Sequence, residues 1–245
     1  MLRFASLALF FALWQAGSVV AGARKLPSPS AVFARLMEEA QSGALFLHLG
    51  TTLGRVTLSF VLALLIGAAI GYAMGRNKTV DRFGDPWLVL FLNLPALVII
   101  VLAYIWVGLN EVAAIGAVAL NKIPNAAATI REGARALDPG LDEMAAVFRF
   151  PALKRLRHVT MPQLAPYVAA AARSGLSLVW KIVLVVEMLG RSNGVGFQIN
   201  VAFQNFDLTL LLAYAVPFVV VMLAIETFAV QPIERRFSSW RTRSA

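Results

Sequence analysis

The chain has 245 residues, of which 59% are hydrophobic and 14% are charged, and its formal net charge is +9. A water-soluble domain of this length cannot bury so much apolar surface, so the composition predicts an integral membrane protein. The positive charge is not a sign of nucleic-acid binding, because the basic residues lie at the ends of hydrophobic stretches, as in the positive-inside distribution. The sequence has no cysteine, which excludes disulfides and thiolate metal sites.

Apolar stretches predict an all-α membrane bundle of about six transmembrane helices, because a helix needs roughly 20 apolar residues to cross a bilayer. In chain order the stretches are 4–23, 56–75, 86–110, 112–130, 165–189 and 208–231. Most of the 22 basic residues fall on one side if both termini are cytoplasmic, which is the predicted topology. No repeat or soluble domain is visible, so we expect a single membrane domain over residues 1–245 that ends in a cytoplasmic tail, 232–245.

Residues 1–23 have two interpretations. Arg3, an apolar run and the small residues Ala21-Gly22-Ala23 resemble a secretory signal with its cleavage site. The apolar run is longer than an ordinary signal core, which favours an uncleaved anchor. The rest of the topology is the same in either case.

Residues 27–55 are predicted to form an extracytoplasmic segment with one short helix. Ser30 is the expected helix cap, and apolar residues follow at helical spacing until Gly43. We interpret this helix as a packed connector on the outer surface.

Small and kink-forming residues recur inside the predicted spans. Gly67, Gly71 and Gly75 line one helix face, where a neighbouring backbone can approach closely, so they are interpreted as a packing device rather than a ligand site. Pro95 and Pro124 free backbone carbonyls that neighbouring helices or a wet cavity must satisfy.

The most polar part of the chain is the loop 131–163, which the topology places in the cytoplasm. Asp138 is a good N-cap and Pro139 suits the first helical position. Leu141, Met144, Ala145 and Phe148 then form an apolar stripe at helical spacing. A second, basic helix is expected from about residue 152, ended by Pro162. The pair could face anionic lipid, or it could dock a soluble partner in a groove.

This loop resembles the EAA loop of ABC-importer permeases, whose pattern is E-A-A, three residues, G, nine residues, I, one residue and L-P. Glu143, Met144 and Ala145 match the first three positions, and the pattern ends without a gap at Val159, Met161 and Pro162.

Arg149 stands where the family usually has glycine. A glycine there would permit a turn with positive φ. We expect Arg149 to make the turn with an ordinary negative φ, helped by Pro151.

The resemblance extends over most of the chain and points to the nitrate, sulfonate and taurine branch of these permeases. It rests on the segment LPSPSAVF, on Trp180 followed by Glu187-Met188, on Gly194-Val195-Gly196, and on Glu234-Arg235-Arg236 with Trp240. Related permeases also serve other small solutes, so the substrate stays open. The localisation implied is the bacterial inner membrane.

The resemblance implies a non-catalytic subunit that binds no cofactor itself. No G-x-x-x-x-G-K-[ST] phosphate loop occurs in the sequence. ATP and Mg would therefore be handled by cytoplasmic ABC ATPase subunits, while an extracytoplasmic solute-binding protein delivers solute to two permease copies, expected to be a homodimer.

Two groups of candidate site residues follow. The ATPase-docking residues implied by the resemblance are Glu143, Met144, Ala145, Ala146, Phe148, Arg149 and Pro162. The substrate-pathway candidates are Trp180, Lys181 and Glu187, because intramembrane charges normally face protein or water. Lys181 could attract an anion, but the favoured alternative is that Lys181 and Glu187 are structural and pair with polar groups on other spans or on the second copy. Lys122 and Glu226 are interpreted as near-interface residues without a chemical role.

Two other function classes compete. An ATP-independent secondary transporter or channel would also be a helical bundle, although usually longer or built from inverted repeats. A membrane-embedded enzyme would need a convergent cluster of catalytic side chains within the spans, and no such cluster is visible.

Overall fold

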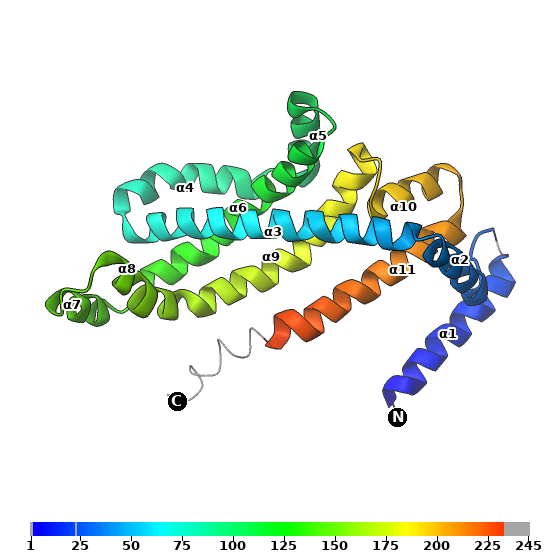
Figure 1. Cartoon of the computed structure of the whole chain (residues 1–245), viewed down its shortest axis with the longest axis horizontal. Coiled ribbons are helices and arrows are strands. Elements are labelled where there is room, and N and C mark those ends of the chain that lie inside the picture. Colours follow the sequence, from blue (N-terminus) through cyan, green and yellow to red (C-terminus); the bar gives the residue numbers. More distant parts are fainter. Residues whose placement is uncertain (1, 23, 233–245) are drawn as a thin grey trace. The chain divides into compact units, whose positions relative to one another are not determined.

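The computed structural model describes residues 2–22 and 24–232, and every regular element in these ranges is helical (Figure 1). This confirms the all-α prediction. The α-helices are α1 (Leu2–Ala21), α2 (Pro29–Gln41), α3 (Ala44–Arg76), α4 (Lys78–Asn93), α5 (Ala96–Val107), α6 (Glu111–Arg135), α7 (Pro139–Val147), α8 (Ala152–Arg155), α9 (Met161–Gly190), α10 (Val195–Gln204) and α11 (Leu208–Ile225). Two π-helices, η1 (Leu156–Thr160) and η2 (Glu226–Val230), complete the elements. The motif Glu234-Arg235-Arg236 and Trp240 lie outside the described residues, as does nearly all of the predicted tail 232–245.

Within the described residues, 3 helical runs are long and apolar enough to cross a membrane: Ala44–Arg76, Ala152–Gly190 and Leu208–Phe228. In α1 the apolar run Ala8–Ala21 is shorter. α6 has 25 residues but is less apolar, because it carries Asn121, Lys122 and Asn125 near its middle.

The predicted span 86–110 is not one continuous helix. α4 and α5 are bent by 97° at the break between them, so that α5 turns away from α4 (Figure 1). The cause is local: Pro95 has no backbone N–H to donate, and the residue before a proline avoids the helical region. Leu94 accordingly has an extended ψ of 127°.

The helix predicted in 27–55 is present as α2, but its cap differs from the prediction. Ser28, rather than Ser30, is the N-cap, and its hydroxyl accepts a hydrogen bond from the Ala31 backbone N–H at 3.2 Å. Gly43 then turns with φ +80°, and α3 begins at Ala44 instead of residue 56. Residues 44–55 are therefore part of the long helix α3.

The helices group into two compact units. One contains the residues up to Gly54 together with Leu184–Ala224, and the other contains Arg55–Val183 together with the helical residues that follow Ile225. The first unit is called the terminal unit and the second the central unit. α3 and α9 each contribute to both.

In the central unit, the partner of the α3 glycine face is the backbone of α6. A Cβ added at Gly67 would lie 2.6 Å from the Ala126 Cβ, and one at Gly75 would lie 2.7 Å from the Arg131 carbonyl oxygen. At Gly71 the added atom would overlap the backbone of Ala127. Only glycine allows this approach, which brings α3 and α6 together along their length.

Candidate functional site

The 131–163 loop is built around α7, which begins where the sequence predicts. Asp138 is the N-cap, and its Oδ1 accepts a hydrogen bond from the Gly140 backbone N–H at 2.8 Å. Pro139 occupies the first turn, where its missing N–H has no cost. The Gln163 side chain accepts from the Asp138 backbone N–H at 2.9 Å, which ties the start of α7 to the start of α9.

Arg149 ends α7 in a left-handed turn, so the expectation of a negative φ is wrong. Its φ is +51°. The Arg149 N–H donates to the Ala146 carbonyl at 3.0 Å, and the Phe150 N–H donates to the Ala145 carbonyl at 2.9 Å. These two bonds form the Schellman motif, which satisfies the last carbonyls of the helix and requires the left-handed residue. The positive-φ turn that a glycine would permit is thus made here by an arginine.

Asp142 clamps α7 to two neighbouring helices, a role that the sequence analysis did not find. Its carboxylate pairs with Arg76 at the end of α3 at 2.5 Å and with Arg155 of α8 at 2.9 Å. Burial alone would raise the pKa of the Asp142 carboxyl, but the hydrogen bonds and charges of Arg155 and Arg76 outweigh it and lower that pKa. The loop is therefore fixed to the end of a long membrane helix through one carboxylate.

The tip of the loop exposes apolar side chains. Phe148 is 69% exposed, and Val147 and Leu153 are similarly open. Glu143 and Ala146 are also exposed, and Met144 is half-buried. Ala145 is buried and cannot touch a partner here. The predicted docking residues therefore divide into an exposed set, the half-buried Met144 and the buried Ala145.

The basic helix does not end at Pro162, contrary to the sequence prediction. α8, η1 and α9 form one helical run, Ala152–Gly190. The π-helical turn η1 ends at Thr160, two residues before Pro162, and its wider hydrogen-bond pattern accommodates a residue without an N–H. The second half of the loop is therefore joined to α9 by a continuous helix.

Glu187 lies within the terminal unit with 0% exposure. Its carboxylate accepts hydrogen bonds from the Thr52 hydroxyl at 2.9 Å and from the Gly196 backbone N–H at 2.8 Å. Gly194, with φ +108°, packs so closely on the carboxylate that any side chain there would overlap it.

The same cluster satisfies the N-terminus of α10. The Gly194 N–H donates to His48 Nδ1 at 3.0 Å, and the Val195 N–H donates to the Thr52 hydroxyl oxygen at 2.8 Å. A carboxylate beside these orphan N–H groups also stabilises the positive end of the helix dipole. This geometry favours the structural alternative for Glu187.

Trp180 and Lys181 belong to the central unit, whereas Glu187 belongs to the terminal unit. The Lys181 side chain is exposed, and its ammonium lies 5.5 Å from the centroid of the Trp180 ring. This is an adjacent cation–π contact, which leaves the ammonium accessible.

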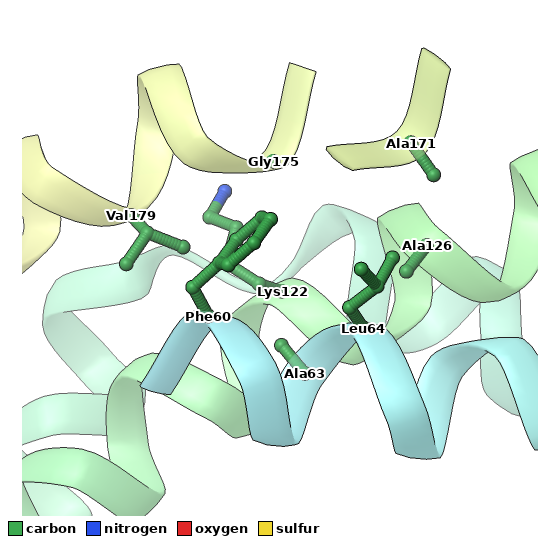
Figure 2. A pocket seen from close by; sticks show the side chains of 8 residues that line it. All are labelled: Phe60, Ala63, Leu64, Lys122, Ala126, Ala171, Gly175 and Val179. Carbon is green, nitrogen blue, oxygen red and sulfur yellow. The ribbon is translucent and has the colours of Figure 1, made fainter. Parts of the chain in front are cut away.

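Lys122 is placed differently from the sequence interpretation. It lies in the middle of α6 and is only 8% exposed, so it is not a near-interface residue. It lines a small cavity formed by α3, α6 and α9 of the central unit (Figure 2). The signal available in the sequence was a single lysine among polar residues of a predicted span, with no indication of the face it occupies.

The family described as "Binding-protein-dependent transport system inner membrane component" matches residues 44–236. The matched range contains the glycine face, the clamped loop, Lys122 and Glu187.

Curated relatives cover nearly the whole chain. The aliphatic sulfonates transport permease SsuC of Bacillus subtilis is 31% identical over 96% of this chain and 85% of its own length. The taurine transport permease TauC of Escherichia coli is 25% identical over 88% of this chain and 80% of its own. The bicarbonate transport permease CmpB of Synechococcus elongatus is 26% identical over 80% of this chain and 74% of its own length.

Solved structures share the fold. An inward-facing MetNI methionine ABC transporter matches with a TM-score of 0.67 and 19% identity, over 81% of this chain and 98% of that chain. A crystal structure of an amino acid ABC transporter with histidines matches with a TM-score of 0.65 and 21% identity, over 82% of this chain and 97% of that chain.

Proposed function

Because this chain belongs to the family of binding-protein-dependent transport system inner membrane components, we propose that two copies of it form the path of an ATP-driven importer for a small anion. Membership itself gives the role of a multi-pass importer permease of the bacterial inner membrane. The second copy, the anionic solute and the route of coupling are the proposal.

The anion is supported by the relatives and by the chain's own charge. The three relatives carry names for aliphatic sulfonates, taurine and bicarbonate, each of which bears a negatively charged oxygen group. This chain has Lys122 and Lys181 on helices of the central unit. Cations at membrane depth are costly and normally serve an ion, a partner or water, so they suit an anionic solute.

The observation that carries the coupling route is the Asp142 clamp. Ion pairs fix α7 to Arg76 at the end of α3 and to Arg155, whose helix continues into α9. A force applied to α7 therefore reaches two long helices of the central unit without passing through a flexible linker. Rigid elements of this kind are what alternating access requires.

The docking surface for the ATPase consists of the exposed loop residues Glu143, Ala146, Val147, Phe148 and Arg149. Phe148 is a large exposed aromatic side chain, and exposed aromatics are typical anchors in partner grooves. Ala145 contributes by packing α7 against its own unit. In this topology the 131–163 loop and both termini are cytoplasmic, and the 27–55 segment faces the binding protein.

The test is transport by the whole complex in vesicles. The binding protein is added on the extracytoplasmic side of the permease, and ATP is supplied on the side of the ATPase. We expect ethanesulfonate or bicarbonate to accumulate with ATP, and accumulation to stop with an ATPase variant that cannot hydrolyse it. Accumulation that needs only an ion gradient would favour the alternative, a secondary transporter. A complex that hydrolyses ATP and accumulates neither anion would contradict the proposed substrate class.

A further inference from the structure

We propose that Lys122 is the solute-contacting cation of the transport path, and that its ammonium binds the charged oxygens of a small oxyanion when α3, α6 and α9 move apart. The inference rests on the proposed import of an anion and names the residue that would bind it.

The position of Lys122 sets it apart from the other lysines at membrane depth. The residue is only 8% exposed, and among the described residues its side chain makes no hydrogen bond or ion pair. Its ammonium nitrogen is not fully enclosed and opens to the cavity. An ammonium that is largely withdrawn from water and lacks a protein partner is unfavourable, and proteins keep such groups mainly where a ligand, an ion or water completes them.

The surroundings of the ammonium are apolar and small. Figure 2 shows the Lys122 side chain passing the Phe60 ring, with its nitrogen between Gly175 and Val179 of α9. The remaining lining residues are Ala63, Leu64, Ala126 and Ala171. No lining residue is acidic, so the cavity carries one positive charge in a medium of low dielectric constant. Attraction to an anion is therefore much stronger there than in water.

The size of the cavity indicates a closed state. Its volume is about 10 Å³, room for about one water molecule. A sulfonate or bicarbonate cannot enter until the three lining helices separate. α3 is held by Asp142 through Arg76, and α9 continues from α8, so the loop that receives the ATPase is attached to two of these helices.

Cavity filling provides an independent variant. A Cβ added at Gly175 would lie 3.6 Å from the Phe60 ring, an ordinary van der Waals distance, so a side chain can be introduced without overlap at its first atom. Gly175→Val would place methyl groups in front of the ammonium and leave the charge in place.

The experiment is uptake of radiolabelled ethanesulfonate and bicarbonate by the full complex in vesicles, for wild type, Lys122→Met, Gly175→Val and Lys78→Met. Lys78 is an exposed lysine at the start of α4 and serves as the charge-matched control. We expect Lys122→Met to lower uptake of both anions at least tenfold, while ATPase copurification and ATP hydrolysis stay within twofold of wild type. Lys78→Met should transport normally.

The outcomes separate the two levels of the proposal. Normal uptake by an assembled Lys122→Met complex would overturn the assignment of Lys122 and leave the anion importer standing. If Lys122→Met does not assemble, Gly175→Val decides: reduced uptake supports the site, and normal uptake overturns it. A wild-type complex that hydrolyses ATP without accumulating either anion would contradict the proposed function, and the Lys122 site with it.

Discussion

Glu187 and Lys122 are both charged side chains buried in membrane helices, but they are buried in opposite ways. Glu187 receives hydrogen bonds from Thr52 and Gly196 and stabilises the first turn of α10. Lys122 has no such partner within the described residues and faces a cavity. A buried carboxyl group that accepts hydrogen bonds from its own unit explains its own presence, whereas a largely buried ammonium that lacks a partner requires an explanation outside the chain.

The largest effect that tests this comparison is expected for Glu187→Ala. The change leaves the buried Gly196 N–H without its acceptor and takes from the Thr52 hydroxyl one of two acceptors, the other being the His48 carbonyl, which should cost ~1–3 kcal/mol of stability. Thermal unfolding in nanodiscs measures it, with Thr52→Val as a milder variant that keeps the carboxylate. A melting temperature equal to that of wild type would show that Glu187 is not structural.

Lys122→Met should change the stability in the opposite direction. Removing a charge that is largely withdrawn from water and has no protein partner, while keeping the length of the side chain, is expected to stabilise the protein by ~1 kcal/mol. The same unfolding measurement tests this, beside the loss of uptake. If Lys122→Met destabilised the protein as much as Glu187→Ala, Lys122 would be a paired structural charge, and the contrast between the two residues would disappear.

Arg149→Gly tests the strained end of α7. Glycine has no steric cost at φ +51°, whereas a side chain costs about 1 kcal/mol there, so the variant should protect α7 amides from hydrogen exchange by about fivefold. Phe206, 88% exposed with φ +55° after α10, is the matched second site, and Phe206→Gly should give a similar gain for α10. Faster exchange in α7 of Arg149→Gly would mean that the arginine side chain itself holds the loop.

The Asp142 clamp gives the smallest effect, because its partners are more than a third exposed and water screens the pairs. Since the pKa of Asp142 is lowered in the folded protein, its contribution is complete at neutral pH. That contribution is lost only as the pH falls below the usual value of 3.8. Protease cleavage of the loop should be constant from neutral pH down to about pH 5. At neutral pH, Asp142→Asn should raise it a few-fold and Glu143→Gln should not. Equal cleavage of both variants would show that the Asp142 ion pairs do not hold the loop, and so do not belong to the coupling route.

Patterns that depend on one helix could be predicted from the sequence, and pairings between helices could not. The N-cap Asp138, the glycine face of α3 and the apolar spans follow from local spacing and composition. The Asp142–Arg76 pair joins residues 66 positions apart, and nothing local indicates it. Which way the Lys122 side chain points depends on how α6 packs against α3 and α9. Its burial and the cavity beside it could therefore not be predicted from the sequence.

Local rules also misled at two places. A negative φ was expected for Arg149 because arginine is rarely left-handed, but the hydrogen bonds of the Schellman motif outweigh that preference. Pro162 was expected to end a helix, but the preceding π-turn lets the helix continue into α9. In both cases a neighbouring hydrogen-bond pattern, rather than the residue type, decides the backbone.

The central claim is that a separate ATPase drives this permease through the exposed tip of the 131–163 loop, and copurification of that ATPase with loop variants tests it most directly. Phe148→Asp should remain in the membrane and lose the ATPase. Phe206 of the terminal unit is even more exposed than Phe148, and Phe206→Asp should retain the ATPase. An undiminished ATPase yield with Phe148→Asp would contradict the account.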